Sequence, residues 1–104
     1  MTIQINTDKS LSVHAEYSDK LEGILSKELS RFADHITRLE VHLSDENGEK
    51  GGVKDKKCLL EARVKGRQPM VVSELGDTYD QSVIGATNKL KSSLTTLFGK
   101  LQSH

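Results

Sequence analysis

With 104 residues, 35% of them hydrophobic and none of them Trp, the chain fits one domain over residues 1–104 with an aliphatic core. No stretch approaches the ~18 apolar residues of a membrane-spanning helix, which argues against a protein that crosses a membrane with helices. The 15 basic and 15 acidic residues cancel, which argues against a strong polyanion binder, although residues 57–104 hold seven Lys/Arg against four Asp/Glu and allow a basic face.

The first predicted elements are a short strand and a helix. Ile3 and Ile5 alternate with polar neighbours, which is typical of a half-buried strand, and residues 7–12 are interpreted as a connection. From about His14 to Phe32, apolar residues recur at three- and four-residue steps, which predicts an amphipathic helix.

Three consecutive strands follow. Apolar and polar residues alternate over 36–44 and again over 58–65, and a further strand is predicted over 70–75. A long polar loop, 45–57, separates the first pair, and a tight turn over 66–69 separates the second. Short connections between consecutive strands favour an antiparallel meander.

The last predicted element is a long helix from Thr78 to about Leu101. Its apolar residues again recur at three- and four-residue steps, and Asp77 is the expected N-cap. A sheet with one apolar face needs cover, and the two amphipathic helices supply it. The sequence therefore predicts an α+β fold: a two-layer β-α-β-β-β-α sandwich whose four-stranded sheet is covered on one face by two helices.

Residues suited to catalysis or metal binding are few and scattered. Cys58 is the only cysteine and lies in the apolar set of a strand, so we expect a buried, inert thiol. The histidines show no metal-ligand spacing, and the glycines of the 45–57 loop precede a strand instead of the helix that a phosphate-binding loop requires. We expect no enzyme activity, no cofactor, no metal and no small-molecule substrate. The first residues lack the pattern of a signal peptide, which indicates a cytoplasmic protein.

Several residues, taken in order, resemble the hibernation-promoting factor and protein Y family of ribosome-associated inhibitors, short type. They are Lys27 and Phe32 near the end of the first helix, Ile36, the strand 39–43, the loop segments 45–48 and 51–58, Asp77 with Tyr79 or Asp80, and Asn88, Lys89 and Leu90. The resemblance covers essentially the whole chain and implies the same β-α-β-β-β-α order. It also implies binding to rRNA of the small ribosomal subunit in the channel for mRNA and tRNA, which blocks the channel without a chemical step.

Binding to phosphates requires Lys or Arg side chains at suitable spacing. The densest local group is Lys57, Arg63, Lys65 and Arg67, with Arg63 and Lys65 expected on one strand face about 7 Å apart. The predicted nucleic-acid contacts are Lys27, Arg31, Arg63, Lys65, Arg67, Lys89 and Lys91. Ordinary solvated charges are the alternative interpretation for all of them. The few aromatic residues suit the core, so base-specific recognition by stacking is not expected.

An alternative function uses the same fold differently. The zero net charge and the mixed charges of the first helix are also compatible with a non-ribosomal interaction or scaffold protein. Such a protein could form a homodimer through the exposed edge of a strand. The sequence leaves the oligomeric state open.

Overall fold

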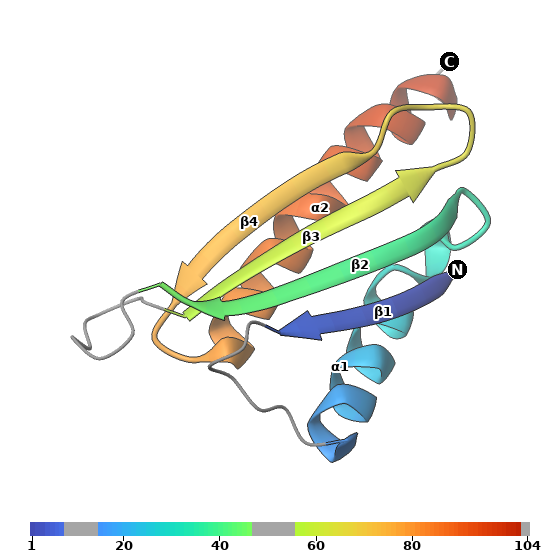
Figure 1. Ribbon diagram of the computed structural model, residues 1–104. Helices are drawn as coiled ribbons and strands as arrows, with labels where there is room; N and C mark the ends of the chain where they lie inside the picture. The colour runs from blue at the N-terminus through green and yellow to red at the C-terminus, as the bar shows by residue number, and fades with distance from the viewer. Residues whose placement is uncertain (8–14, 47–55, 103–104) are drawn as a thin grey trace.

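A computed structural model of the chain describes residues 1–7, 15–46 and 56–102, and the side chains of these residues up to residue 99. The predicted order of strands and helices is confirmed (Figure 1). The elements are β1 (Thr2–Thr7), α1 (Ala15–Glu28), the 3-10 helix η1 (Ser30–Phe32), β2 (Ile36–Asp45), β3 (Lys56–Val64), β4 (Met70–Gly76) and α2 (Tyr79–Gln102).

The four strands form one sheet in the order β1-β2-β3-β4, so β1 and β4 are its edges. β2, β3 and β4 pair antiparallel as predicted, with Leu39 opposite Ala62 and Leu60 opposite Val72. β1 pairs parallel with β2, because the chain crosses over through α1 between them. The fold is α+β, as expected.

Both helices cover the same face of the sheet, and the core lies between the two layers (Figure 1). Alternate residues of β2 and β3 form the sheet side of the core. Residues three and four apart in α1 and α2 form its helix side. The buried apolar residues are Leu21, Leu25, Leu29, Phe32, Ile36, Leu39, Val41, Leu43, Cys58, Leu60, Ala62, Val64, Val83, Ala86, Leu90, Leu94 and Phe98. The core is aliphatic apart from two Phe rings, which agrees with the prediction from composition.

The first helix is shorter than predicted. α1 ends at Glu28, and the chain continues as η1, where the Phe32 N–H donates to the Leu29 carbonyl oxygen at 2.9 Å. This tighter i to i+3 bonding turns Phe32 into the core, where its ring lies 6.2 Å from that of Phe98. His14, the predicted start of this helix, lies outside the described residues, as do residues 8–12 of the predicted connection.

The second helix is capped by Thr78 and not by Asp77. α2 begins at Tyr79, and the Thr78 hydroxyl oxygen accepts a hydrogen bond from the Gln81 N–H at 3.1 Å. In return, Gln81 Oε1 accepts from the Asp77 N–H at 3.0 Å, an arrangement related to a capping box. Both residue types are good N-caps, so the register of the first turn decides between them.

Strand boundaries differ from the prediction around the long loop. Asp45 belongs to β2, and Lys56 and Lys57 belong to β3, because Asp45 pairs with Lys56 at the end of the ladder. Residues 47–55 of the predicted loop lie outside the described part of the chain. At its other end β3 stops at Val64, so Lys65 lies in the following turn and does not share a strand face with Arg63.

Candidate nucleic-acid interface

The fold brings most of the predicted basic residues to one end of the sheet. This is the end at which β2 begins and β3 finishes, since these strands run antiparallel. η1 precedes β2 there, and the β3–β4 turn leaves from the same end (Figure 1). We call the basic end the set Arg31, Arg38, Arg63, Lys65 and Arg67. Lys27 lies in the last turn of α1, just before η1.

Backbone hydrogen bonds fix the basic end. The Lys65 N–H donates to the His35 carbonyl oxygen at 2.9 Å, which joins the β3–β4 turn to the segment that follows η1. The Arg67 N–H donates to the Val64 carbonyl oxygen at 3.1 Å and closes a tight turn. Gly66 stands in this turn at φ 71°, a left-handed conformation that a residue with a Cβ rarely adopts. Lys65 and Arg67 thus stand on either side of Gly66 in a turn closed by a hydrogen bond.

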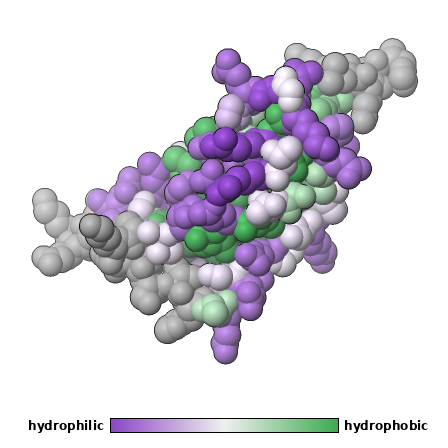
Figure 2. All heavy atoms as spheres, turned by 45° about the vertical axis from the view of Figure 1, so that its right-hand side comes forward, coloured by the Kyte–Doolittle hydropathy of each residue, from purple (hydrophilic) through white to green (hydrophobic). Residues whose placement is uncertain are grey.

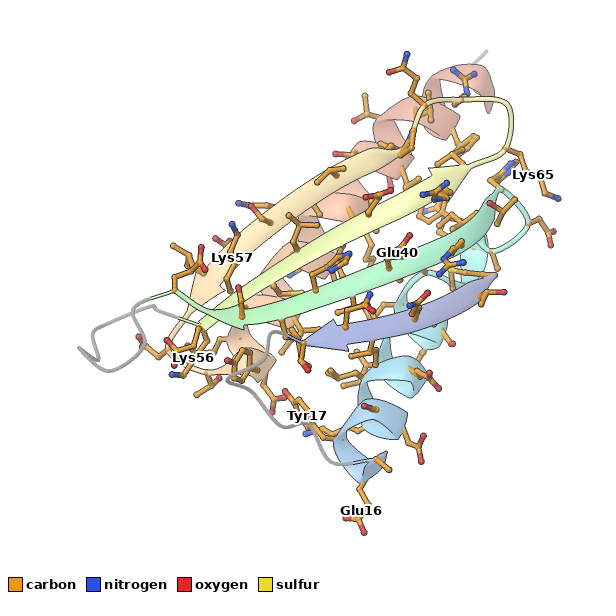
Figure 3. The ribbon with its side chains drawn as sticks, viewed as in Figure 1. Glu16, Tyr17, Glu40, Lys56, Lys57 and Lys65 are labelled. Atoms are coloured by element: carbon orange, nitrogen blue, oxygen red, sulfur yellow. The ribbon has the colours of Figure 1, made fainter. Side chains whose placement is uncertain are left out.

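Arg38 and Arg63 lie opposite each other on the outer face of the sheet, away from the helices. Glu40, which pairs with Glu61, lies in the next row on this face, as Figure 3 shows, and its side chain is only 18% exposed. Glu40 Oε2 is 3.5 Å from Arg38 Nε and 3.7 Å from an Arg63 nitrogen, and Glu61 approaches Arg63 at 3.6 Å. The two guanidinium groups are therefore partly neutralised but held in fixed positions.

Lys65 and Arg67 are exposed, and neither forms an ion pair within the described residues. Arg31 is exposed as well, with its guanidinium carbon 5.0 Å from the centre of the Phe32 ring. This cation–π contact orients Arg31 without neutralising it. Asp34 is an exposed acidic residue in the same segment, so positive charge predominates at this end without being uniform.

Three aromatic rings pack together below the basic end, on the core side. The rings of His35 and Phe98 are stacked with their centres 4.0 Å apart, and the Phe32 ring also packs against Phe98. Phe32 and Phe98 are buried, as expected for core residues. They pack beneath the surface that carries the basic residues and, being buried, offer no ring face to a nucleic-acid base.

The remaining predicted residues, Lys89 and Lys91, lie in α2 and contact groups of this chain. Lys91 Nζ is 2.9 Å from a carboxylate oxygen of Glu28 and joins α2 to α1. This interaction lowers the pKa of the Glu28 carboxyl, first through the hydrogen bond and then through the charge of Lys91. Lys89 Nζ donates to the Ser73 carbonyl oxygen at 2.9 Å and is 3.5 Å from Glu74. Both lysines are therefore engaged away from the basic end.

Lys57, part of the densest basic group in the sequence, lies at the opposite end of β3. It precedes Arg63 by roughly 20 Å of strand and is 3.5 Å from Glu46. Arg38, in contrast, was not among the predicted contacts, although alternation places it on the polar face of its strand. The signal that identifies it is the β2–β3 register, which sets it beside Arg63.

The structure offers little for other chemistry. Cys58 is buried, and burial raises the pKa of its thiol to about 12, so the thiolate is disfavoured at neutral pH as predicted. Among the described residues, no group of His, Cys, Asp and Glu side chains is arranged to hold a metal ion. Within the same part of the chain, no helix is long and apolar enough to cross a membrane. On the face seen in Figure 2, hydrophilic side chains predominate and hydrophobic side chains show in patches between them.

Two solved structures resemble this fold over nearly its whole length. The Thermus thermophilus protein Y N-terminal domain superposes with a TM-score of 0.72 at 16% identity, covering 93% of this chain and 99% of that one. A ribosomal subunit interface protein from Coxiella burnetii gives a TM-score of 0.68 at 17% identity, covering 95% and 99%. At such identities these likenesses show the fold. No curated protein sequence matches the chain. Residues 11–102 match the Ribosomal_S30AE family, described as sigma 54 modulation protein / S30EA ribosomal protein, and the chain therefore belongs to that family of non-enzymatic, ribosome-associated translation inhibitors.

Proposed function

We propose that this protein is a cytoplasmic hibernation factor, used under stress, that binds rRNA of the small ribosomal subunit and blocks the mRNA and tRNA channel. Family membership supports the ribosome as partner. The observation that carries the binding mode is the gathering of exposed Arg and Lys side chains at one end of a neutral molecule. The proposed interface consists of the basic end together with Lys27; Lys89 and Lys91 are left out because they contact this chain's own groups.

Phosphate contact explains how a protein of zero net charge binds a polyanion. Charges farther away than a Debye length, about 8 Å at physiological ionic strength, are largely screened. An approaching RNA strand therefore interacts with the basic end and not with the average charge of the protein. Guanidinium groups suit phosphates particularly well because they donate two hydrogen bonds in a fixed geometry.

Blocking the channel requires no conformational change and no chemical step. Arg38 and Arg63 stand on paired strands, and Arg67 stands on a turn closed by a hydrogen bond, so little backbone entropy is lost when these residues meet phosphates. Contacts to the sugar–phosphate backbone position a protein without recognising bases. The bound domain then excludes mRNA and tRNA by its volume.

The test is co-sedimentation with purified small subunits across a series of salt concentrations. The variant Lys65→Gln/Arg67→Gln removes two exposed cations of the basic end. We expect weaker binding and a flatter plot of log affinity against log salt, by about 0.7 to 0.9 for each phosphate that the variant no longer neutralises. Addition of mRNA and initiator tRNA should displace the wild-type protein.

The matched control is Lys20→Gln/Lys91→Gln, which removes the same net charge. These lysines face Asp80 and Glu28, so their replacement leaves the basic end unchanged. The control should bind with the wild-type salt dependence. Equal weakening in both variants would show that only net charge matters, and no binding of the wild-type protein at low salt would favour the interaction-protein alternative.

A further inference from the structure

β4 is an edge strand, paired with β3 on one side of its backbone only. Lys89 extends from α2, and its Nζ donates to the Ser73 carbonyl oxygen at 2.9 Å. This carbonyl group therefore points away from β3. The Leu75 N–H donates to Glu74 Oε1 at 3.2 Å and so lies on the same side. Because alternate residues of a strand point their backbone groups the same way, the open edge is formed by Val71, Ser73 and Leu75.

Two side chains close the middle of this edge. Glu74 and Lys89, which we call the edge clasp, are 3.5 Å apart, and each also holds a backbone group of β4. α2 makes room for the clasp at Gly85, where a Cβ atom would come within 2.6 Å of Glu74 Cγ. The clasp thus depends on a glycine in the helix that faces the strand.

The side chains along this edge are unusually apolar for an exposed strand. Val71 is 56% and Leu75 is 46% exposed, and both lie on the sheet face opposite the helices. If β4 paired antiparallel with β4 of a second copy about a two-fold axis at Ser73, Val71 of each copy would lie opposite Leu75 of the other. Such a contact is self-complementary, and each aliphatic pair across the strands adds favourable contact.

We infer that the β4 edge is a pairing surface for a second copy of this chain, and that the edge clasp holds it closed. With the clasp in place, the Ser73 carbonyl and the Leu75 N–H are occupied, and strand addition is blocked at the centre of the edge. Without it, two copies join their sheets into one through these groups. This surface is separate from the basic end and does not depend on the proposed ribosomal function.

The test measures molar mass by sedimentation equilibrium over a range of protein concentrations. The Lys89→Ala variant should become a dimer at concentrations at which the wild-type protein is a monomer. Lys91→Ala is the matched control, because it removes the same charge from the same helix but breaks only the contact with Glu28. It should stay monomeric. Adding Val71→Lys to Lys89→Ala should restore the monomer by placing charge in the pairing surface.

A thiol at the two-fold axis locates the contact. Hydrogen-bonded antiparallel pairs have Cα atoms about 5.5 Å apart, a separation that a disulfide spans. Under oxidation, Ser73→Cys/Lys89→Ala should form a covalent dimer much faster than Ser73→Cys alone, while Cys58 stays buried.

Three results would overturn the inference: a folded Lys89→Ala that remains monomeric, a dimer that survives Val71→Lys, or a wild-type dimer whose affinity Lys89→Ala leaves unchanged. If Lys89→Ala fails to fold, Gly85→Ala displaces Glu74 instead, and the same masses decide.

Discussion

Gly66 shows how a single residue positions the interface. Its φ of 71° allows the tight turn that sets Lys65 and Arg67 apart. A Cβ built at Gly66 meets no atom within 4 Å, and neither does one at Gly23 in α1. The two glycines therefore differ in backbone conformation and not in available space.

Replacement by alanine should have opposite effects at these two positions. Gly66→Ala should lower the free energy of unfolding by about 1–2 kcal/mol, because a left-handed conformation strains any residue with a Cβ. Gly23→Ala should raise it by up to about 1 kcal/mol, because alanine is the better helix former at an exposed helix position. Urea denaturation measures both, and changes of equal sign would contradict this account of the turn.

At the scale of elements, polar bridges tie α1 to α2. The Tyr17 hydroxyl donates to Asp80 Oδ1 at 2.7 Å, and Lys20 Nζ is 3.3 Å from Asp80 Oδ2. The hydrogen bond from Tyr17 and then the contact with Lys20 lower the pKa of the Asp80 carboxyl below its usual 3.8, against an opposing effect of burial. The pKa of the Tyr17 phenol is raised, first by burial and then by the same hydrogen bond.

The lowered pKa of Asp80 predicts an acid-sensitive link between the helices. A carboxyl group whose pKa is lower in the folded state stabilises the fold above its unfolded pKa, and this stabilisation is lost as the pH falls through the folded pKa. Asp80→Asn should therefore flatten the fall in unfolding free energy below about pH 3.8. Tyr17→Phe should reproduce most of this effect, because it removes the largest cause of the shift. Chemical denaturation at a series of acidic pH values checks the prediction, and it is wrong if Asp80→Asn follows the wild-type curve.

At the scale of the whole molecule, positive charge is concentrated at one end of the sheet. Among the described residues at the opposite end, Lys56 pairs with Asp45 at 2.8 Å and Lys57 with Glu46 at 3.5 Å. A net charge of zero therefore hides an uneven distribution. Non-specific binding follows such local fields more closely than it follows the sum of charges.

This distribution predicts retention on a cation-exchange resin even near the sequence pI of about 6.9. Lys65→Gln/Arg67→Gln should elute at clearly lower salt than the wild-type protein, because the resin binds the basic end. Lys20→Gln/Lys91→Gln has the same net charge as that variant but keeps the basic end. It should elute close to the wild-type protein once the small shift expected from the two lost charges is subtracted. Co-elution of the two variants would contradict the claim that location matters.

Sequence reasoning predicted the elements and their buried faces because these depend on local patterns. The alternation of Leu39, Val41 and Leu43 and the spacing of Leu90 and Leu94 each place a side chain on a known face of a strand or helix, and all five are buried. Element ends were harder to predict, because two neighbouring residues, Asp77 and Thr78, were both suitable caps. The 3-10 helix η1 between α1 and β2 also escaped prediction, since the spacing that buries Phe32 fits the last turn of an α-helix as well as a 3-10 turn.

The sequence by itself therefore determined the order of elements, the aliphatic core and the family resemblance, which the comparison with known families confirmed. Only the tertiary structure decided which lysines and arginines are available. Arg38 lies beside Arg63 through strand register, and Lys91 meets Glu28 across 63 residues of sequence. The physical reason is that side-chain pairing depends on how strands and helices pack over long separations, whereas periodicity reports only the face on which each residue lies.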